Sequence, residues 1–350
     1  MNNSSRYERQ QILRHIGREG QERLSQARVA VVGLGALGTV SAGLLARAGV
    51  GHLLVVDRDF LEMHNLQRQV LYDEADVREN LPKAIIAKRK LESINSEIYI
   101  RAEVADINSD TVDEVLGGVD LVIDGTDNVE TRFLINDYCL KNRIPWIYGG
   151  AIGTEGMSYV VLSEGPPCLR CLFGEAPGPG TTQTCDQVGI LAPVAHLIAS
   201  FQATEAIKLL AGKKDMIDRK LWKVDLWSRQ FKAISVDHLK ESPCGGCRDG
   251  DYTYLKRQEG SRAVTLCGRN AVQIYSHRKE QIDFKRLAEN LADSAEVSFN
   301  DYLLNIRTLP YEITLFQNGR AIVKGTEDTG QARSLYAKYV GHKPRRESEA

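Results

Sequence analysis

The chain has 350 residues and a formal net charge of −1, with 43% hydrophobic and 26% charged residues. This length predicts one large domain and a smaller one, and the composition is typical of a soluble globular protein. Nothing in the charge balance indicates a nucleic-acid-binding surface, the most apolar stretch (residues 190–201) is too short to span a bilayer, and the N-terminus lacks the apolar segment of a signal peptide.

Helical and strand patterns alternate along the first part of the chain. A Ser-x-x-Glu capping box at Ser5 predicts a first helix with Ile12, Leu13 and Ile16 on one side. Residues 28–32 then form a β-branched strand, residues 37–48 a helix and residues 52–56 a second buried strand, which is a βαβ unit and predicts a parallel sheet. Further predicted elements are helices 83–94 and 130–142, strands 98–104, 119–123 and 146–148, and an antiparallel strand 157–162 with one solvated face.

The second half of the chain predicts the end of this domain and a separate small module. Residues 175–189 form a long loop rich in Gly, Pro and Thr, residues 190–210 a helix that lies deep in the core or at a dimer interface, and residues 221–236 more strand. The polar composition of residues 248–260 is typical of a linker. After it, Asn318-Gly319 predicts a type I′ hairpin, and Asp328 caps a final helix that carries Leu335, Tyr336 and Tyr339 on one face.

The fold class that follows is α/β: a Rossmann-like doubly wound, mostly parallel sheet that continues into antiparallel strands, plus a small C-terminal α+β module. We expect the first domain at residues 1–250, the small domain at residues 261–342 and a disordered charged tail at residues 343–350.

A glycine-rich loop, Gly33-Leu-Gly35-Ala-Leu-Gly38, joins the first strand to its helix. Gly33 allows the tight turn, Gly35 lets the backbone approach a phosphate, and Gly38 lets the helix pack closely on the strand. Asp57, 24 residues after Gly33 and at a strand end, can accept hydrogen bonds from ribose hydroxyls. The loop indicates a nucleotide without saying which one, and a tight turn with no ligand is the alternative.

Cations and acids follow this loop in positions that suit a triphosphate and its metal. Asn65, Arg68, Gln69 and Lys83 come after the second strand, where a doubly wound sheet places its ligand crevice. Arginine and lysine hold phosphate oxygens, and a phosphoryl or nucleotidyl transfer needs such charges more than a hydride transfer does. Asp124 and Asp127 close the fourth strand and can hold Mg²⁺. Taken singly, Arg68 and Lys83 could also be solvated surface cations.

Two C-x-x-C pairs, Cys168–Cys171 and Cys244–Cys247, predict a closed tetrahedral zinc site with a structural role. The alternatives are an iron–sulfur cluster or a thiol redox pair. In a chain of this size such pairs also favour a reducing, cytoplasmic location over a disulfide framework. A fifth cysteine, Cys185, lies in the long loop just before a helix and is either a nucleophile with a lowered pKa or an incidental loop residue.

Together these motifs resemble the ThiF/MoeB family, whose enzymes activate sulfur-carrier proteins and are relatives of the ubiquitin-activating enzymes. The resemblance covers residues 5–250 and rests on motifs that occur in the same order: Arg6-Tyr-Glu-Arg9-Gln10, the glycine loop, Asn65-Leu-Gln-Arg68-Gln69, Lys83, Asp124-Gly-Thr-Asp127-Asn128 with Arg132, and the two cysteine pairs.

The resemblance implies ATP-dependent adenylation of the C-terminal Gly-Gly carboxylate of a ubiquitin-like carrier protein, with release of pyrophosphate. It implies that Asp57 holds the ribose, that Arg68 and Lys83 hold the phosphates and that Asp127 binds Mg²⁺. It further implies a homodimer in which Arg9 reaches the triphosphate of the neighbouring subunit. Asn65, Gln69 and Asn128 are assigned to the same nucleotide pocket.

The resemblance leaves the branch of the family to be decided. In the thiazole branch the cysteine that matches Cys185 can link covalently to the carrier, whereas in the molybdopterin branch its counterpart is dispensable for adenylation. The C-terminal module looks like the extension of thiazole-pathway members, which favours a ThiS-type carrier in thiamine biosynthesis and makes a cysteine desulfurase-type sulfur donor a further candidate partner. The alternatives are a molybdopterin-synthase activator, an NAD-dependent dehydrogenase and a non-catalytic carrier-binding scaffold.

Overall fold

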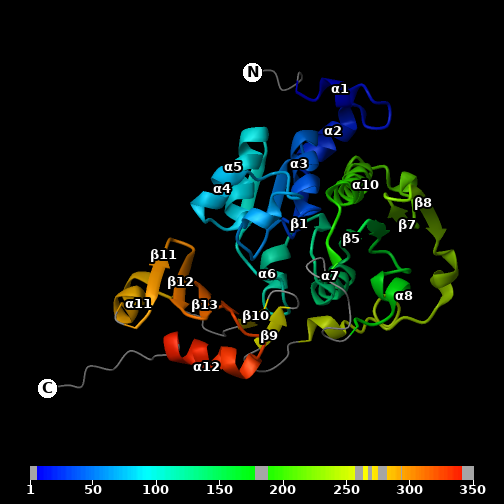
Figure 1. The fold of residues 1–350 in the computed structure, drawn as a ribbon. Coiled ribbons are helices and arrows are strands. Elements are labelled where there is room, and N and C mark those ends of the chain that lie inside the picture. The colour runs from blue at the N-terminus through cyan, green and yellow to red at the C-terminus, as the bar shows by residue number, and fades with distance from the viewer. Residues whose placement is uncertain are drawn as a thin grey trace. The chain divides into compact units, whose positions relative to one another are not determined.

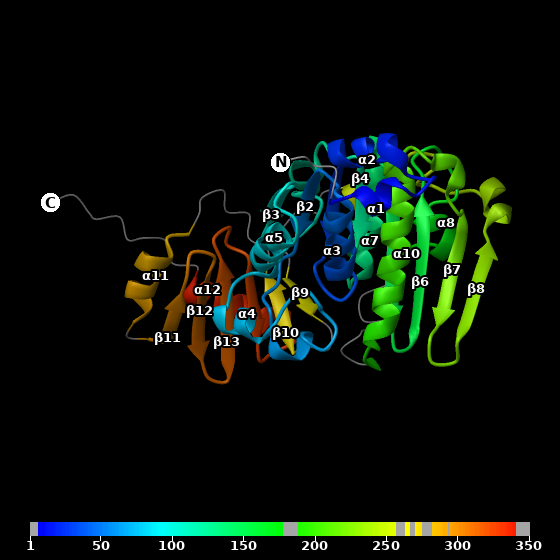
Figure 2. The same cartoon turned by 90° about the horizontal axis from the view of Figure 1, so that it is seen from above.

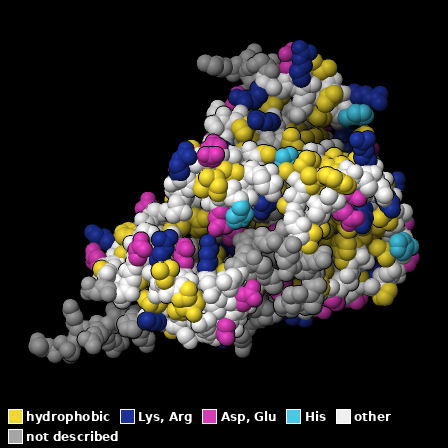
Figure 3. Space-filling view, viewed as in Figure 1, with side chains coloured by type: hydrophobic (Ala, Val, Ile, Leu, Met, Phe, Trp, Pro, Cys, Tyr) yellow, Lys and Arg dark blue, Asp and Glu magenta, His cyan; other side chains and the backbone are white. Residues whose placement is uncertain are grey.

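The structure, a computed structural model, describes residues 6–177, 188–256, 263–266, 270–274, 282–292 and 294–340. The chain divides into two compact units, Met1–Arg257 and Gln258–Ala350, and the division falls inside the segment predicted to be a linker. None of the helices described is both long enough and apolar enough to cross a membrane. On the face drawn in Figure 3, acidic and basic side chains are interspersed and do not gather by sign.

The first unit is built on a mixed sheet whose eight described strands follow the order β3-β2-β1-β4-β5-β6-β7-β8 (Figure 1). Strands β3 to β5 in this order are parallel, and β6, β7 and β8 add to the edge in antiparallel pairs. The predicted doubly wound sheet with an antiparallel continuation is therefore confirmed. Its strands are β1 (Arg28–Val32), β2 (His52–Val56), β3 (Tyr99–Glu103), β4 (Leu121–Asp124), β5 (Trp146–Ile152), β6 (Glu155–Val161), β7 (Lys220–Asp225) and β8 (Gln230–Ser235).

Helices cover both faces of the parallel part of the sheet. In β1, Val29 and Val31 join one core cluster while Ala30 and Val32 join the other, as expected for a strand buried on both sides. Helices α2, α3, α5 and α10 pack on the first face and α7 on the second (Figure 2). Helix α6 also contributes to the core of the second face. The helices are α1 (Glu8–Gln11), α2 (Gly17–Gln26), α3 (Gly38–Ala48), α4 (Glu74–Glu79), α5 (Lys83–Ile94), α6 (Val112–Leu116), α7 (Val129–Asn142), α8 (Leu169–Phe173) and α10 (Ala192–Leu210).

The order of the strands indicates where a doubly wound sheet binds its ligand. From β1 the chain proceeds outward through β2 and β3, and then returns to β4 on the other side of β1. The connections after β1 and after β4 therefore leave the sheet in opposite directions. Such a switch point opens a crevice at the carboxyl ends of the two strands.

The first predicted helix is wrong in its extent. Helix α1 has only four residues, and α2 begins separately at Gly17, whose φ is +64°. Ile12 and Leu13, predicted to lie on one side of this helix, are 66% and 55% exposed. An amphipathic pattern extends a helix only where its apolar side is buried, and within the described chain these two side chains are not. The capping residue Ser5 lies outside the described residues.

The second unit is an α+β module, as predicted. The six strands described for it form one sheet in the order β11-β12-β13-β14-β10-β9, and their pairs are antiparallel. Asp328 caps the last helix by accepting hydrogen bonds from the amides of Gly330 and Gln331, which confirms the predicted cap. The elements are β9 (Ala263–Leu266), β10 (Ala271–Ile274), α11 (Phe284–Leu291), β11 (Glu296–Phe299), β12 (Leu303–Thr308), β13 (Tyr311–Phe316), β14 (Ala321–Lys324) and α12 (Thr329–Tyr339).

The hairpin between β13 and β14 forms where predicted, but its turn is not type I′. The amide of Gly319 donates to the carbonyl of Phe316, and the amide of Phe316 donates to the carbonyl of Arg320. Gly319 alone in this loop has a left-handed φ, +82°, whereas a type I′ turn would require Asn318 to adopt one as well. The loop therefore has three residues and ends in a left-handed glycine, the next most common hairpin solution.

Candidate functional site

The glycine loop after β1 lies against the loop after β4 with backbone touching backbone. Gly33 has φ +86°, and its amide donates to the carbonyl of Val56 at 2.8 Å. A Cβ on Gly38 would lie 1.8 Å from the carbonyl oxygen of Gly33, and one on Gly125 would lie 2.5 Å from the same atom. Gly35 differs, because a Cβ there would meet only the side-chain nitrogen of Gln69, at an ordinary 3.8 Å. The protein's own packing therefore requires glycine at positions 33, 38 and 125 but leaves space beside position 35.

Asp57 follows β2 directly and is held by two backbone amides. Its carboxylate accepts hydrogen bonds from Leu34 at 2.6 Å, within the glycine loop, and from Asp59 at 2.7 Å. Burial raises the pKa of this carboxyl, and the positive charge of Lys83 opposes the shift. The acid is therefore fixed beside the glycine loop, at the strand end where a ribose-binding acid was predicted.

Lys83 is the first residue of α5, and its side chain is only 5% exposed. The backbone amide of Lys83 donates to the carbonyl of Asp59 at 2.9 Å, which places this helix start next to the end of β2. The interpretation of Lys83 as a solvated surface cation is therefore wrong. Arg68 is partly exposed and donates to the carbonyl of His64 at 3.0 Å.

The segment that contains Asn65, Arg68 and Gln69 folds back on itself. The side chain of Asn65 accepts a hydrogen bond from the amide of Glu62 at 3.0 Å, and the backbone carbonyl of Asn65 accepts from the amides of Arg68 and Gln69. Gln69 is 3% exposed, and its Oε1 has no hydrogen-bond partner within the described chain. A buried polar atom without a partner is rare and indicates a position where a ligand or water supplies the missing bond.

Tyr72 is a member of this site that no sequence motif indicated. Its ring is buried, and its hydroxyl lies 3.1 Å from the carbonyl of Leu34 and 3.4 Å from that of Lys83. Burial, with the negative charges of Asp57 and Asp76, raises the pKa of this hydroxyl well above its usual value. Tyr72 therefore stays protonated and ties the glycine loop to the start of α5.

The two acids after β4 have different surroundings. Asp124 is fully buried and accepts from the amide and hydroxyl of Thr126 and from Nε of Arg132 at 3.1 Å. Burial raises the pKa of Asp124, and Arg132 opposes the shift. Its oxygens are thus engaged within the protein. Asp127 is exposed at the mouth of the same loop, and Asn128 caps α7 by accepting from the amide of Thr131 at 2.8 Å.

Gln202 of α10 and Arg132 of α7 hold this loop from two sides. The side-chain amide of Gln202 donates to the carbonyls of Asp124 at 2.7 Å and Ile147 at 3.0 Å. Arg132 donates to the carbonyls of Thr126 at 2.6 Å and Gly149 at 3.3 Å. Arg132 belongs to a sequence motif that gave it no role, and Gln202 was not predicted, since its only signal is a polar residue in an apolar helix.

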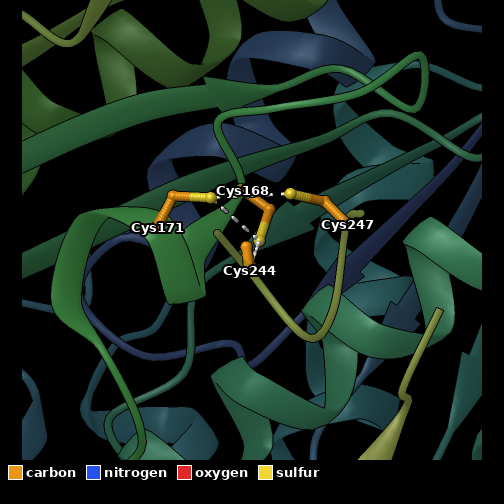
Figure 4. A group of neighbouring side chains, drawn as sticks. All are labelled: Cys168, Cys171, Cys244 and Cys247. Carbon is orange, nitrogen blue, oxygen red and sulfur yellow. Dashed lines mark hydrogen bonds between the residues drawn. The ribbon is translucent and has the colours of Figure 1, made fainter. Parts of the chain in front are cut away.

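The four predicted zinc ligands meet in one cluster (Figure 4). The sulfur atoms of Cys168, Cys171, Cys244 and Cys247 all lie within 4.8 Å of one another. Three of the separations are 3.9, 3.7 and 3.5 Å. Four sulfurs at about 2.3 Å from one zinc ion would stand about 3.8 Å apart in a tetrahedron, so the donor set fits zinc. Hydrogen bonds with Cys168 and Cys247 lower the pKa of Cys171 to about 4, while Cys168 and Cys171 raise the pKa of Cys247.

The remaining predicted residues lie away from the crevice or outside the described chain. Arg9 is exposed on α1, which is bound to the carboxyl-terminal end of α3, whereas the glycine loop is at the other end of that helix. Cys185 lies outside the described residues, and its predicted roles stay predictions.

Known proteins resemble this chain in sequence and in fold. The model of the ThiF family matches residues 7–246. A sulfur carrier protein ThiS adenylyltransferase of Bacillus subtilis is 39% identical over 339 residues, which cover 97% of this chain and 100% of the relative. A molybdopterin-synthase adenylyltransferase of Salmonella typhimurium is 40% identical over 246 residues, or 69% of this chain and 95% of that one.

Among solved structures, E. coli MccB crystallised with ATP has a TM-score of 0.60 at 24% identity, covering 70% of this chain and 75% of that one, which is a likeness of fold. The resemblance drawn from the sequence motifs is confirmed by the family match and the relatives. The chain belongs to the ThiF family.

Proposed function

We propose that this protein is an adenylyltransferase that uses ATP to activate the C-terminal glycine of a ThiS-type, ubiquitin-like sulfur carrier in thiamine thiazole biosynthesis. One observation carries the choice of branch: the similarity to a ThiS adenylyltransferase extends over 97% of this chain, including the C-terminal module. The similarity to a molybdopterin-synthase adenylyltransferase stops at 69% of the chain. The family match gives no support to the dehydrogenase alternative.

The proposed reaction needs positioning and charge rather than a general base. A carboxylate oxygen of the carrier's terminal glycine attacks the α-phosphorus of ATP, and the bond from that phosphorus to the β,γ-pyrophosphate breaks. The products are the carrier acyl-adenylate and pyrophosphate. A terminal carboxylate is already ionised at neutral pH, so no proton has to be removed. The protein's contribution is to align the two substrates and to stabilise charge on the departing pyrophosphate.

The nucleotide would lie over the ends of β1, β2 and β4. The space beside Gly35 and the amides at the start of α3 suit phosphate oxygens, and Asp57 suits the ribose. Lys83 supports the phosphate role best, because a buried cation at a helix start provides a stronger field than an exposed one. Arg68 adds a planar donor from the neighbouring segment.

A magnesium ion bound to Asp127 and the phosphates would neutralise part of the triphosphate charge. We assign this role to Asp127 because it is exposed in the loop after β4, whereas Asp124 is fully buried. The unpartnered Oε1 of Gln69 supports its place in the pocket, since the amide could bond to a bound ligand. Asn65 and Asn128 would act indirectly, because the Asn65 side chain holds the turn that begins at Glu62 and the Asn128 side chain caps α7.

Arg9 would act from a second copy of the chain, which makes the enzyme a homodimer. Helix α3 separates α1 from the glycine loop and has 11 residues. At 1.5 Å per residue it spans about 16 Å, well beyond the reach of an arginine side chain. The Arg9 of one subunit is therefore available to a neighbour and not to its own nucleotide.

The cysteine cluster would hold a structural zinc ion, because four thiolates leave no open coordination position for chemistry. A reducing cytoplasm suits such a site. A covalent link between Cys185 and the carrier, and a cysteine desulfurase-type sulfur donor, remain part of the proposal.

Isotope exchange between labelled pyrophosphate and ATP tests the reaction, with a ThiS-type or a molybdopterin-type carrier supplied separately. We expect exchange with magnesium and the ThiS-type carrier. Exchange with the molybdopterin-type carrier alone would overturn the choice of branch, and a lack of exchange with every Gly-Gly-ended carrier would overturn the activity.

The site assignments are tested in the same assay. Lys83→Ala and Arg68→Ala each remove a charge that acts on the departing pyrophosphate, and we expect each to lower kcat/KM by about 100-fold or more. Lys88→Ala, on the exposed side of the same helix as Lys83, is the matched control. A carrier-binding scaffold, in contrast, would keep its function in Asp127→Ala.

A further inference from the structure

Helix α1, which carries Arg9, is too short to hold its own shape. It has four residues, and isolated helices of that length do not persist in water. Arg9 itself is exposed and has no hydrogen bond or ion pair with any residue that the structure describes. Its direction must therefore be set by the side chains that attach α1 to the rest of the unit.

Tyr7 is the first of these attachments. It is 8% exposed, and its hydroxyl accepts a hydrogen bond of 2.8 Å from the side-chain amide of Asn95. Asn95 is fully buried and also donates to the carbonyl of Ala46 near the end of α3. The Tyr7 ring fills the space beside Gly49, whose φ is +79° and whose missing Cβ would lie 2.6 Å from the ring. The tyrosine thus occupies a fitted pocket where α3 and α5 end.

Gln10 is the second attachment. Its side-chain amide donates to Oε1 of Gln21 at 2.7 Å and to the carbonyl of Ala48 at 2.9 Å. Gln21, which is 5% exposed, donates to the same carbonyl at 2.9 Å. The last carbonyls of a helix lack partners within it, so these side chains satisfy the end of α3 while they fix α1.

We propose that Tyr7 and Gln10 are positioning residues that hold Arg9 in the direction needed by the active site of a second copy of the chain. This inference rests on the proposed function. The two residues flank Arg9 in sequence, and both attach to rigid helix ends. When α1 is held in place beforehand, an arginine that reaches to another subunit loses less side-chain and backbone freedom as it binds, so its interaction is stronger.

The first experiment compares Tyr7→Phe and Gln10→Ala with Glu8→Ala, an exposed residue of the same helix, in the pyrophosphate exchange assay. Tyr7→Phe removes one positioning hydrogen bond and Gln10→Ala removes two, and either variant should slow pyrophosphate exchange by about tenfold or more. Glu8→Ala should match the parent. The double variant Arg9→Ala/Gln10→Ala should be no slower than Arg9→Ala, because the positioning residue has nothing left to position.

The second experiment distinguishes positioning in trans from general damage. Chains with Gln10→Ala and chains with Asp127→Ala are co-expressed with different tags, and the mixed dimer is purified. The intact nucleotide site on the Gln10→Ala chain then receives a properly held Arg9 from the Asp127→Ala chain. We expect this dimer to recover as much activity as the mixed dimer of Arg9→Ala with Asp127→Ala. A mixed dimer as slow as the Gln10→Ala homodimer would overturn the proposal.

A third measurement does not need catalysis. Backbone amides of residues 8–11 should exchange hydrogen with solvent faster in Tyr7→Phe and Gln10→Ala than in Glu8→Ala, with unchanged exchange in β1. Equal rates of hydrogen exchange at residues 8–11 in all three variants would overturn the inference even if the parent enzyme is active. If α1 loosens as expected while the parent never exchanges pyrophosphate, the proposed function has failed and the positioning contacts stand as a structural feature only.

Discussion

The hydroxyl of Tyr72 lies 3.1 Å from the carbonyl oxygen of Leu34 and joins two segments that are 38 residues apart. Leu34 belongs to the glycine loop, and Tyr72 ends the segment that contains Arg68 and Gln69. The same hydroxyl lies 3.4 Å from the carbonyl of Lys83. The three parts of the proposed phosphate site therefore meet at one buried phenol.

We expect Tyr72→Phe to weaken ATP binding without removing a catalytic charge. The loss of one buried hydrogen bond should cost about 1 kcal/mol of unfolding free energy. Because the glycine loop is then less fixed, KM for ATP should rise several-fold while kcat changes less. Denaturant unfolding and exchange kinetics at varied ATP concentration measure both effects. Tyr99→Phe, at a residue 61% exposed, is the control, and equal behaviour of the two variants would contradict the prediction.

Two glycines of α3 provide a second prediction with its own control. Gly38→Ala would bring a methyl group within 1.8 Å of the carbonyl oxygen of Gly33, so the loop must shift and nucleotide binding should be lost. A Cβ on Gly43, in the same helix, would meet no atom within 4 Å, and Gly43→Ala should raise the unfolding free energy by about 0.5–1 kcal/mol. Calorimetric titration with ATP measures the affinity of both variants for the nucleotide, and thermal unfolding measures their stability. Retention of ATP affinity by Gly38→Ala would contradict the proposed nucleotide-binding role of the glycine loop.

Much of this site could be predicted from the sequence because its signals are local. The βαβ periodicity, the glycine spacing and the C-x-x-C pairs each involve a few neighbouring residues. Helix α5 begins at Lys83 and ends at Ile94 as predicted. The preceding Pro82 marks its start, and the pattern of apolar residues gives its extent.

What could not be predicted depends on contacts between distant residues. Gln202 reaches the carbonyl of Asp124 across 78 residues, and Tyr72 reaches Leu34 across 38. A polar residue in an apolar helix does not indicate its partner. The prediction of the N-terminal helix failed although its apolar pattern is local. Ile12 and Leu13 are exposed, so no burial of that side extends the helix.

Asp124 and Asp127 should respond differently to the same substitution. Asp124→Asn leaves the guanidinium of Arg132 buried without its anion, which should cost about 3–5 kcal/mol of unfolding free energy. Asp127→Asn alters an exposed side chain and should leave stability within about 0.5 kcal/mol of the parent while abolishing exchange. Denaturant unfolding and the exchange assay separate the two roles. An active Asp127→Asn enzyme would remove this residue as the magnesium ligand.

The cysteine cluster should hold one zinc ion per chain, and its removal should destabilise the first unit. Elemental analysis of the purified protein measures the stoichiometry, and thermal unfolding with and without a strong chelator measures the stabilisation. Cys168→Ser should lose the metal and lower the melting temperature. Cys139→Ala is the control, since Cys139 is buried in apolar surroundings, outside the cluster, and burial raises its pKa. Iron or sulfide in the analysis would contradict the zinc assignment.

Asp137 should make stability depend on pH in a defined direction. Burial raises the pKa of its carboxyl to about 6, against hydrogen bonds from the Tyr254 amide and the Asn136 side chain. A raised pKa means that the fold favours the protonated form. Its stabilisation is therefore present at low pH and is lost as pH rises through 6.

Between about pH 5 and pH 7.5 the metal-loaded parent should lose about 1 kcal/mol of unfolding free energy relative to Asp137→Asn, a value reduced for solvent screening. Denaturant unfolding of both proteins at matched pH measures this difference, in which other titrating groups cancel. If the unfolding free energy of the parent relative to that of Asp137→Asn stays constant or rises with pH, the carboxyl of Asp137 is ionised in the folded protein without an energetic penalty.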